Sequence, residues 1–353
     1  MKIVLDGMGG DFAPENTVAG AKRALARFGS IESLYLTGDE ARLRAEVDAQ
    51  GLRDRRLEIV HAGSVVAMND PATAAVRGKK DSSITVGAEL VRSGAAEALV
   101  SAGNTGAAVA ATSVKWRMLK GVERPGIATP LPAEHGICHL LDAGANVDAK
   151  ARHLVQYAVM GSVYARRVVG VEKPRVGLIS VGEEDEKGTD FTREVFGMLK
   201  QTAGVNFVGN IEGHHLFEGG IDIALCDGFT GNVVLKTAEA TAKIMFKWLR
   251  TEIKASPLRM MGALISKGAF KAVKARGSYE SYGGSPLLGV RGICIIGHGS
   301  SSPVAIENAL RVAVEAIEHR VNPVIEEHLA RLGTDAAGGP AEAAREGTQT
   351  SES

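Results

Sequence analysis

Short apolar runs recur along the chain, and most of them end in a loop that contains glycine or aspartate. Continuous apolar runs of this length are typical of strands buried on both faces. Between most of the runs, apolar residues recur at helical spacing. The alternation predicts an α/β fold with a largely parallel sheet. The predicted strands occupy 2–6, 33–38, 57–63, 97–104, 139–146, 175–184, 205–213, 222–228 and 293–301, and the predicted helices occupy 14–28, 40–50, 72–93, 149–166, 190–201, 231–253 and 303–332.

The ligands of such sheets bind at the carboxyl ends of the strands. The glycine-rich loops of this sequence follow the predicted strands, so we expect them to converge on one site. We expect residues 1–332 to form a single catalytic domain. The remaining residues, 333–353, lack apolar periodicity and are predicted to be disordered.

A basic segment over 243–285 is predicted to protrude from this domain as a helical arm. From Lys243 to Arg276 the chain has nine basic residues and one acid, Glu252. An apolar stripe over 258–272, with further apolar residues outside it, exceeds what one packing face requires. The arm could contact anionic lipid, dock an acidic carrier protein, or pack in a dimer with its charged face in solvent. The candidate contact residues are Leu258, Met260, Met261, Leu264, Ile265, Lys267 and Lys271.

Composition and charge narrow the function classes. The 41 basic and 41 acidic residues give zero net charge, which argues against binding of nucleic acid. Cys138, Cys226 and Cys294 lie far apart in apolar runs without a CxxC pair, so we expect buried thiols in a reducing compartment. We find no signal peptide and no apolar run long enough to cross a bilayer. We therefore expect a cytoplasmic protein whose membrane contacts are peripheral.

The segment SAGNTGA at 101–107 follows a predicted strand and suits the start of a helix. Its small residues leave backbone N–H groups free at the helix N-terminus, and its polar side chains add neutral donors. We favour a phosphate- or thioester-binding role for Gly103, Asn104, Thr105 and Gly106. The alternative is a capped helix start.

Three further loops contain polar groups that suit an anion. Gly231 and Asn232 lie in the first turn of a predicted helix, where Gly231 is a candidate phosphate- or thioester-binding residue and Asn232 is either a donor to an anion or an N-cap. Lys187 ends an acidic loop whose acids are either solvated or hold its ammonium group charged. The loop of His298 and Ser300 precedes a helix that starts with proline, so His298 is either a general base or structural.

Two acidic turns are open to a structural interpretation. The glycine-rich turn between Asp6 and Asp11 allows either close approach of a ligand or a tight, capped strand-to-helix connection. The turn after Asp142 has oxygen ligands that suit Mg²⁺, but turn formation and helix capping explain it better. We expect no metal site.

Taken together, these motifs closely resemble one family, the acyl-acyl carrier protein:phosphate acyltransferases of bacterial phospholipid synthesis. The resemblance runs in order over about residues 1–330 and departs at Gly7, where the family commonly has alanine. The matching segments are DGMGGDFAPE (6–15), MNDPATAAVRGKKDSSI (68–84), SAGNTGA (101–107), LLDAGANVD (140–148), YAVMGSVYA (157–165), LISVGEEDEKGTD (178–190), FVGNIEG (207–213), CDGFTGNVVLKTAE (226–239) and HGSSSP (298–303).

The resemblance implies a three-layer α/β/α fold related to phosphotransacetylases and isocitrate-type dehydrogenases. It implies a homodimer with a protruding helical arm, and it marks Lys187 and Asn232 as the family's catalytic lysine and asparagine. The implied activity transfers a long-chain acyl group from acyl carrier protein to inorganic phosphate, without a cofactor. It also implies loose membrane contact and delivery of the acyl-phosphate to a membrane glycerol-3-phosphate acyltransferase.

Phosphate is itself a nucleophile, so this chemistry needs no serine or cysteine nucleophile, and the chain has no GxSxG motif. We expect Lys187 to bind phosphate and Asn232 to donate to phosphate or the oxyanion, with further donors from the two loops that contain Thr105 and His298. A nicotinamide-dependent dehydrogenase is a rival that lacks the GxGxxG motif, and a non-enzymatic scaffold is another. The nearest alternative is a short-chain phosphotransacetylase that uses coenzyme A.

Overall fold

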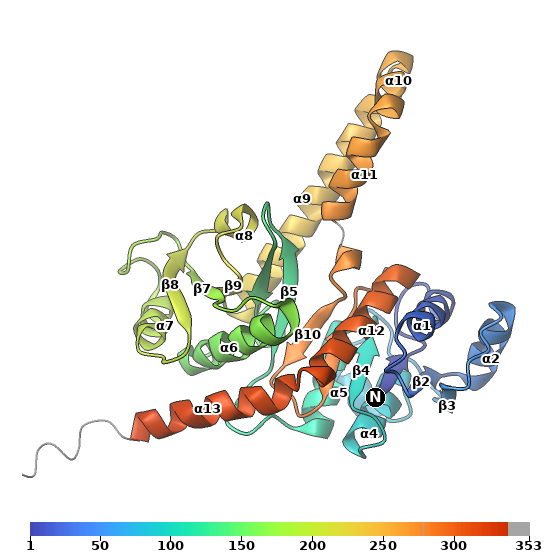
Figure 1. The fold of residues 1–353 in the computed structure, drawn as a ribbon, viewed down its shortest axis with the longest axis horizontal. Coiled ribbons are helices and arrows are strands. Elements are labelled where there is room, and N and C mark those ends of the chain that lie inside the picture. The colour runs from blue at the N-terminus through green and yellow to red at the C-terminus, as the bar shows by residue number, and fades with distance from the viewer. Residues whose placement is uncertain (278, 338–353) are drawn as a thin grey trace, which may run out of the picture.

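The computed structural model describes residues 1–277 and 279–337 (Figure 1). Among these residues, eleven strands form one sheet in the order β3-β2-β1-β4-β11-β10-β5-β6-β9-β7-β8. The strands are β1 Lys2–Asp6, β2 Ser33–Gly38, β3 Leu57–His61, β4 Ala98–Ser101, β5 Gly126–Pro132, β6 Ile137–Leu141, β7 Arg175–Ile179, β8 Asn206–Ile211, β9 Ile223–Leu225, β10 Ser285–Leu288 and β11 Ile293–Ile296.

The sheet consists of two parallel blocks, β3-β2-β1-β4-β11 and β6-β9-β7-β8. The antiparallel strands β10 and β5 join these blocks in the middle of the sheet. The predicted α/β fold with a largely parallel sheet is therefore confirmed. Neither β5 nor β10 was predicted, because Pro130, Pro132 and Pro286 interrupt apolar runs that would otherwise read as strands.

Helices connect most of the strands. Their bounds are α1 Glu15–Arg27, α2 Glu40–Ala49, α3 Ala72–Gly78, α4 Ser83–Arg92, α5 Thr105–Trp116, α6 Ala151–Tyr164, α7 Asp190–Lys200, α8 His215–Glu218, α9 Gly228–Lys254, α10 Pro257–Ile265, α11 Lys267–Arg276, α12 Pro303–Glu318 and α13 Val321–Ala337. A π-helical turn, Ala165–Val169, extends α6, and a 3₁₀ turn, Tyr279–Ser281, follows the arm.

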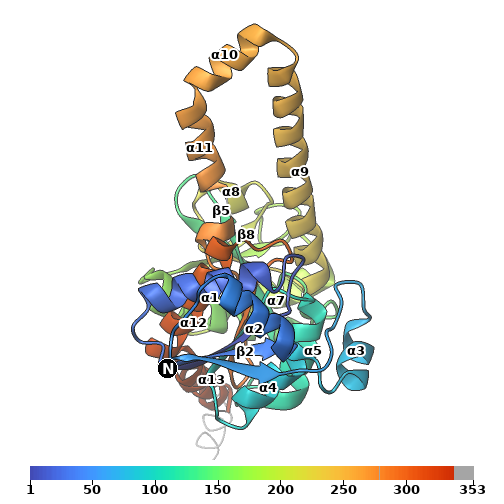
Figure 2. The same cartoon turned by 90° about the vertical axis from the view of Figure 1, so that its right-hand side faces the viewer.

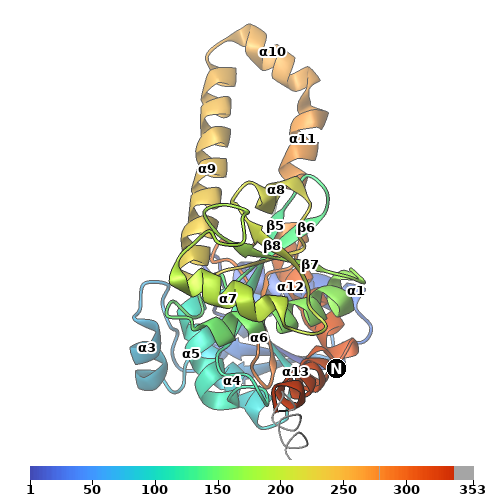
Figure 3. The same cartoon turned by 90° about the vertical axis from the view of Figure 1, so that its left-hand side faces the viewer.

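Helices cover both faces of the sheet and give the expected three layers (Figures 1 and 3). Successive residues of a strand point to opposite faces. Ile3 and Leu5 of β1 therefore pack into a core with α1, α6, α7, α12 and α13. Val4, between them, packs into a second core with α3, α4 and α5. The two cores fix the register of the central strands and so the position of the loops at their ends.

The helix boundaries differ from the predicted ones at several places. The predicted helix 72–93 divides into α3 and α4, and 303–332 divides into α12 and α13 next to Arg320, whose φ of 52° is left-handed. Helix α5 was missing from the predicted helices, although the motif at 101–107 indicated its start. Helix α13 continues past 332 to Ala337, and 338–353, most of the tail predicted to be disordered, lie outside the described residues.

The predicted helical arm stands clear of the rest of the molecule (Figures 2 and 3). Helix α9 rises along one side, α10 forms the tip, and α11 returns. The continuous stripe predicted over 258–272 is wrong as a single helical face, because α10 ends at Ile265 and α11 begins at Lys267. All seven candidate contact residues are exposed, with Leu258 at 77% and Leu264 at 72%.

Two further expectations concern burial and membrane spans. The three cysteines, expected to be buried thiols, are indeed free and buried. In the part of the chain that the structure describes, every helix is too short or too polar to cross a bilayer.

A buried carboxylate links α1 to α12. Arg23 Nε donates to Glu307 Oε2 at 2.6 Å, and Arg27 Nη1 donates to Glu307 Oε1 at 3.0 Å. Burial raises the pKa of Glu307, but the hydrogen bonds from Arg27 and Arg23 outweigh burial and leave this pKa below its ordinary value. A carboxyl group whose pKa falls on folding stabilises the fold above its unfolded-state pKa of about 4.3. This stabilisation is lost as the pH falls through the folded-state pKa.

We therefore expect Glu307→Gln to lower the free energy of unfolding by about 1–3 kcal/mol at pH 7, because two charged hydrogen bonds are weakened. The difference from the wild type should shrink as the pH falls below about 4, where the wild-type carboxylate becomes protonated. Urea denaturation across this pH range measures both effects. Glu40→Gln, which weakens only the exposed pair with Arg44, is the control and should cost at most about 0.5 kcal/mol. Equal losses in the two variants would contradict the prediction.

Candidate functional site

A cleft of about 690 Å³ opens where the two parallel blocks of the sheet meet, near the root of the arm. Its volume lies in the range of ~300–1,000 Å³ that is usual for small-molecule sites. Asp11, Thr105 and His298 reach it from the loops or helix starts that follow β1, β4 and β11. Gly144 and Asn232 reach it from the segments that follow β6 and β9. Loops at the carboxyl ends of both blocks thus meet in one place.

The lining of the cleft divides into polar and apolar parts. The polar side chains belong mainly to the loops and to the first turns of α9, and the apolar ones to β5, α8 and the higher turns of α9. The polar set includes Asp11, Thr105, Asn232, Lys236, Glu239 and His298, and the apolar set includes Leu131, Phe217, Leu235, Ala238, Ala242 and Phe246. The cleft can therefore hold a ligand that has a charged end and an apolar tail.

Helix α5 begins at the cleft. Asn104 is its N-cap, because Asn104 Oδ1 accepts the N–H of Ala107 at 3.0 Å. Asn104 Nδ2 donates to three carbonyl oxygens of the loop 67–70. The structure thus engages this side chain in capping and in holding a loop. Thr105 and Gly106 line the cleft, where the first-turn N–H groups of a helix are available to an anion.

Gly103 is buried beneath this helix start. Its N–H donates to Ser101 Oγ at 3.1 Å, and Ser101 Oγ donates to Asp6 Oδ2 at 2.8 Å. The N–H of Met8 donates to Asp6 Oδ1 at 3.3 Å. Burial raises the pKa of Asp6, and these hydrogen bonds oppose the rise. Asp6 therefore has a structural part in the turn, in which the N–H of Gly103 is also occupied, while Asp11 at the other end of the turn lines the cleft.

His298 lines the cleft, and Ser300 orients its ring. The N–H of Ser300 donates to His298 Nδ1 at 3.1 Å, and Ser300 Oγ lies 2.7 Å from the same nitrogen. A nitrogen that accepts a backbone N–H has no proton, so the neutral ring has its proton on Nε2. Burial lowers the pKa of His298, and the nearby charges have smaller effects. At neutral pH the ring is therefore uncharged, with Nε2 as its donor.

Helix α9 presents Asn232 to the cleft. The N-cap of α9 is Asp227, so Asn232 is not a cap; it is the fifth residue of the helix and lies exposed in the second turn, beside Gly144. Gly231 is buried, and a Cβ at this position would collide with the carbonyl oxygen of Asp142. Glycine is required here for close packing of α9 on the Asp142 turn. The packing fixes where Asn232 stands.

The carboxylate of Asp142 organises this turn. Its Oδ1 accepts the N–H groups of Ile127, Gly144 and Ala145, and its Oδ2 accepts that of Asn146, all within 3.1 Å. Burial raises the pKa of Asp142, and the four hydrogen bonds oppose the rise. The turn is thus built by hydrogen bonding to the carboxylate.

Lys187 lies exposed in the loop after β7 and is outside the set of residues that line the cleft. Strands β7 and β9 pair in parallel, so this loop and the start of α9 leave neighbouring strand ends. The acids of the loop point to other partners: Glu183 Oε1 lies 3.6 Å from His215 Nε2, and Asp185 Oδ2 accepts from Lys200 Nζ at 2.5 Å. Within the described residues, Lys187 forms no ion pair with them.

Asn210 on β8 supports the Lys187 loop from below. Its Nδ2 donates to the carbonyl oxygen of Glu184 at 2.8 Å, and the same oxygen accepts the N–H of Lys187 at 3.0 Å. Asn210 is only 6% exposed. Its Oδ1 and the nearby Ser180 Oγ are buried without a hydrogen-bond partner among the described residues. One buried amide therefore supports the turn that presents Lys187.

The sequence reasoning missed Lys236, which belongs to the described lining of the cleft as its one cation. Its Nζ lies 3.1 Å from Glu239 Oε2, which also lines the cleft. Helical spacing could have revealed it, because residues four apart lie on one face and Lys236 follows Asn232 by four. The apolar wall from β5 could not be found in this way, since β5 itself was not predicted.

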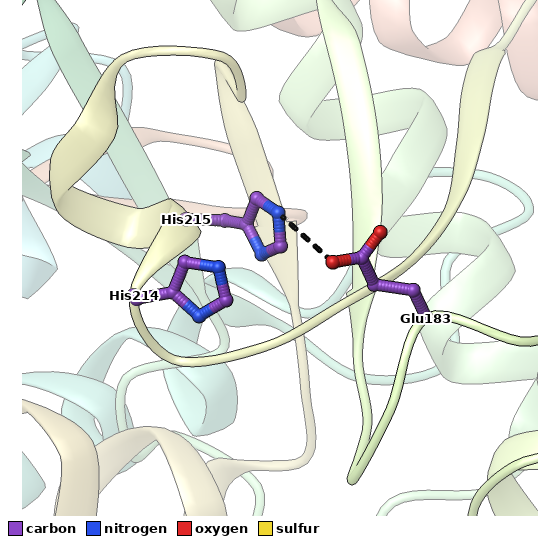
Figure 4. Close-up of side chains that lie close together, drawn as sticks. All are labelled: Glu183, His214 and His215. Atoms are coloured by element: carbon purple, nitrogen blue, oxygen red, sulfur yellow. Dashed lines mark ion pairs between the residues drawn. The ribbon is translucent and has the colours of Figure 1, made fainter.

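A second polar cluster lies outside the cleft, where Glu183, His214 and His215 approach one another (Figure 4). The N–H of Glu212 donates to His215 Nδ1 at 3.1 Å, so the neutral His215 ring has its proton on Nε2. Nε2 faces Glu183 and is then a hydrogen-bond donor rather than a metal ligand. This geometry fits anchoring of the Lys187 loop better than coordination of a metal ion.

Comparison with known proteins decides the family. A family model described as "Fatty acid synthesis protein" matches residues 1–323. The chain belongs to this fatty acid synthesis protein family. One relative, a phosphate acyltransferase from Akkermansia muciniphila, is 60% identical to this chain over 339 residues. The match covers 95% of this chain and 97% of that protein. A phosphate acyltransferase from Pelotomaculum thermopropionicum is 49% identical over 96% of this chain and 98% of its own length.

Solved structures support the fold of this fatty acid synthesis protein. The EutD phosphotransacetylase of Staphylococcus aureus matches with a TM-score of 0.58 at 15% identity, covering 89% of this chain and 93% of that one. A phosphotransacetylase of Streptococcus pyogenes matches with a TM-score of 0.59 at 16% identity, covering 90% and 94%. The relation to the phosphotransacetylase fold, expected from the resemblance, is confirmed.

We expect Asn210→Ala to loosen the Lys187 loop, because the carbonyl oxygen of Glu184 loses its side-chain donor. Hydrogen–deuterium exchange of a peptide spanning 183–190 should become at least several-fold faster, while exchange in the central strands stays unchanged. Asn206→Ala is a matched control, since Asn206 lies on the same strand and donates at 3.4 Å to the carbonyl oxygen of Lys173, away from the loop. Unchanged exchange of 183–190 in Asn210→Ala would show that other contacts hold the turn.

Proposed function

We propose that this chain transfers an acyl group from a thioester onto inorganic phosphate and so forms an acyl-phosphate. The near full-length similarity to phosphate acyltransferases supports this proposal. A phosphate oxygen attacks the thioester carbonyl carbon, the C–S bond breaks, and the departing thiolate takes up a proton. The single observation that favours this reaction in the structure is a cleft that joins helix N-termini and neutral donors to an apolar wall.

The donor groups of the cleft suit the charge that develops in this reaction. The N-terminus of α5 with Thr105 and Gly106 supplies N–H groups, and Asn232 supplies a carboxamide. Groups of this kind stabilise an oxyanion when they are held in place beforehand. Neutral His298 adds an N–H donor from Nε2 and no charge.

We assign phosphate binding to Lys187, which stands at the strand end next to that of Asn232. The residue lies outside the lining of the cleft, so its long side chain must reach across from its loop. An ammonium group without an ion pair among the described residues is available to a phosphate. Its loop is anchored on either side of Lys187 by Asn210 and by Arg193, whose Nη1 donates to the carbonyl oxygen of Gly188 at 2.8 Å.

The acyl donor is proposed to be acyl carrier protein with a long chain, and the acceptor of the product a membrane glycerol-3-phosphate acyltransferase. The basic, exposed arm suits both an acidic carrier protein and an anionic membrane at the cytoplasmic face. Coenzyme A is the alternative donor, and parallel assays with both thioesters separate the two. A dehydrogenase activity would instead require binding of a nicotinamide nucleotide.

The arm also suits pairing of two copies of this chain. Helices α9 and α11 stand apart along much of their length (Figures 2 and 3). Met245, Trp248 and Leu249 of α9 are 60%, 62% and 42% exposed, which leaves a long apolar face uncovered. We propose a homodimer in which the partner's arm covers this face.

The assignment of Lys187 is tested with hexadecanoyl-acyl carrier protein, phosphate and hydroxylamine, which traps acyl-phosphate. Lys187→Ala should lower turnover by about 10²–10³-fold, the usual effect of losing one donor to a developing oxyanion. Circular dichroism should show an unchanged fold, because the side chain is exposed. Lys200→Ala removes another exposed ammonium group of the same region and should keep most of the activity. Wild-type turnover in Lys187→Ala would refute the assignment.

Membrane contact by the arm is tested by flotation with liposomes that contain anionic phospholipid. Changing Leu258 and Met261 together to glutamate should abolish most of the flotation, since each charge must stay out of the apolar layer. Val114→Glu places one glutamate on an exposed apolar residue of α5, far from the tip, and should leave flotation intact. Unchanged flotation of the arm variant would contradict membrane contact, and the arm would then serve carrier binding or dimer packing.

A further inference from the structure

The face of α9 that lines the cleft has two chemically different edges. Asn232, Lys236 and Glu239 form a polar edge on its first turns. At ~100° per residue, the apolar lining residues fall on the adjacent edge and continue higher along the helix. These apolar residues are Leu235, Ala238, Ala242 and Phe246.

A second apolar wall faces this edge. Leu131 and Pro132 of β5 and Phe217 of α8 line the same cleft. Pro132 has no N–H, so it leaves no backbone donor to be satisfied on an apolar surface. These two apolar walls form a channel suited to a hydrocarbon chain, and the polar edge of Asn232, Lys236 and Glu239 runs along one side of it.

The side chains of Ala238 and Ala242 determine how wide the channel is. Ala238 and Ala242 are neighbours on this edge, with Leu235 before them and Phe246 after them, and each small side chain leaves room that a larger one would fill. Phe246, 47% exposed, stands at the far end near the root of the arm. The channel therefore has its smallest side chains in the middle of its length.

We propose that Ala238 and Ala242 set the length of the acyl chain that the enzyme accepts, with the thioester carbonyl beside Asn232 and the chain running along α9 toward Phe246. This inference rests on the proposed acyl transfer and names its specificity residues. The apolar half of the cleft then holds a linear, saturated hydrocarbon chain.

Helix geometry gives the lengths. At a rise of 1.5 Å per residue, Ala238 stands ~9 Å, Ala242 ~15 Å and Phe246 ~21 Å along the axis from Asn232. An extended backbone advances ~3.3–3.6 Å for every three bonds, or roughly 1.2 Å per bond, and a hydrocarbon chain is similar. Ala238 therefore lies about eight bonds, Ala242 about twelve and Phe246 about seventeen bonds from the carbonyl.

The test replaces each alanine by phenylalanine and measures kcat/KM with octanoyl-, dodecanoyl- and hexadecanoyl-acyl carrier protein. Ala242→Phe should lower the hexadecanoyl value at least about tenfold while the octanoyl value stays close to wild type, since each methylene kept out of the channel costs about fourfold. Ala238→Phe should also lower the dodecanoyl value. Ala240→Phe, on the same helix and outside the cleft lining, is the matched control and should leave the profile unchanged. Thermal denaturation checks that all three variants are folded.

Separate outcomes overturn the two levels of the proposal. If the wild type forms no hydroxylamine-trapped product from any thioester and phosphate, the acyl transfer itself is refuted. The channel assignment fails, and the acyl transfer stands, if the wild type is active but the folded variants do not differ in chain-length preference. This is the case if Ala238→Phe and Ala242→Phe lower kcat/KM equally for all three donors, or if both variants lose activity at the same chain length.

Discussion

Three segments that line the cleft, β5, the turn after β6 and the start of α9, meet at Asp142. It accepts N–H groups from β5 and from the turn after β6, and the backbone of the same residue packs on Gly231 of α9. A buried carboxylate is costly unless it is fully hydrogen-bonded, and four N–H groups meet that requirement here. The positions of Asn232 and of the apolar wall of β5 both follow from this one arrangement. Without the carboxylate, four N–H groups at this junction would lose their acceptor.

Much of the fold could be predicted because each strand of the two parallel blocks is a short apolar run followed by a loop. The loops at 101–107 and after His298 were placed at one site for the same reason. Strands β5 and β10 escaped prediction because prolines interrupt them, and antiparallel pairing across long stretches of sequence leaves no local signal. Because β5 was not predicted, the apolar wall that it contributes to the cleft was not predicted either.

Side-chain roles were harder to predict than positions. Asn104 and Ser300 have the donor chemistry expected of ligand contacts, yet the structure uses Asn104 as a helix cap and Ser300 to orient His298. The acids around Lys187 could have been its partners, but two of them, Glu183 and Asp185, pair with His215 and Lys200 instead. Such choices depend on which side chains meet in space, and this information lies in the tertiary packing. Lys187 and Asn232 remain linked by neighbouring strand ends and by the family resemblance.

One uninterrupted helix, α9, runs from the cleft to the outer part of the arm. With 27 residues it is ~40 Å long. A single helix therefore sets the separation between the cleft and the outer part of the arm, because no loop within it could lengthen or shorten that distance. Asn232 and the tip of the arm are thus linked through one element, and each residue added to α9 or removed from it would change their spacing by ~1.5 Å.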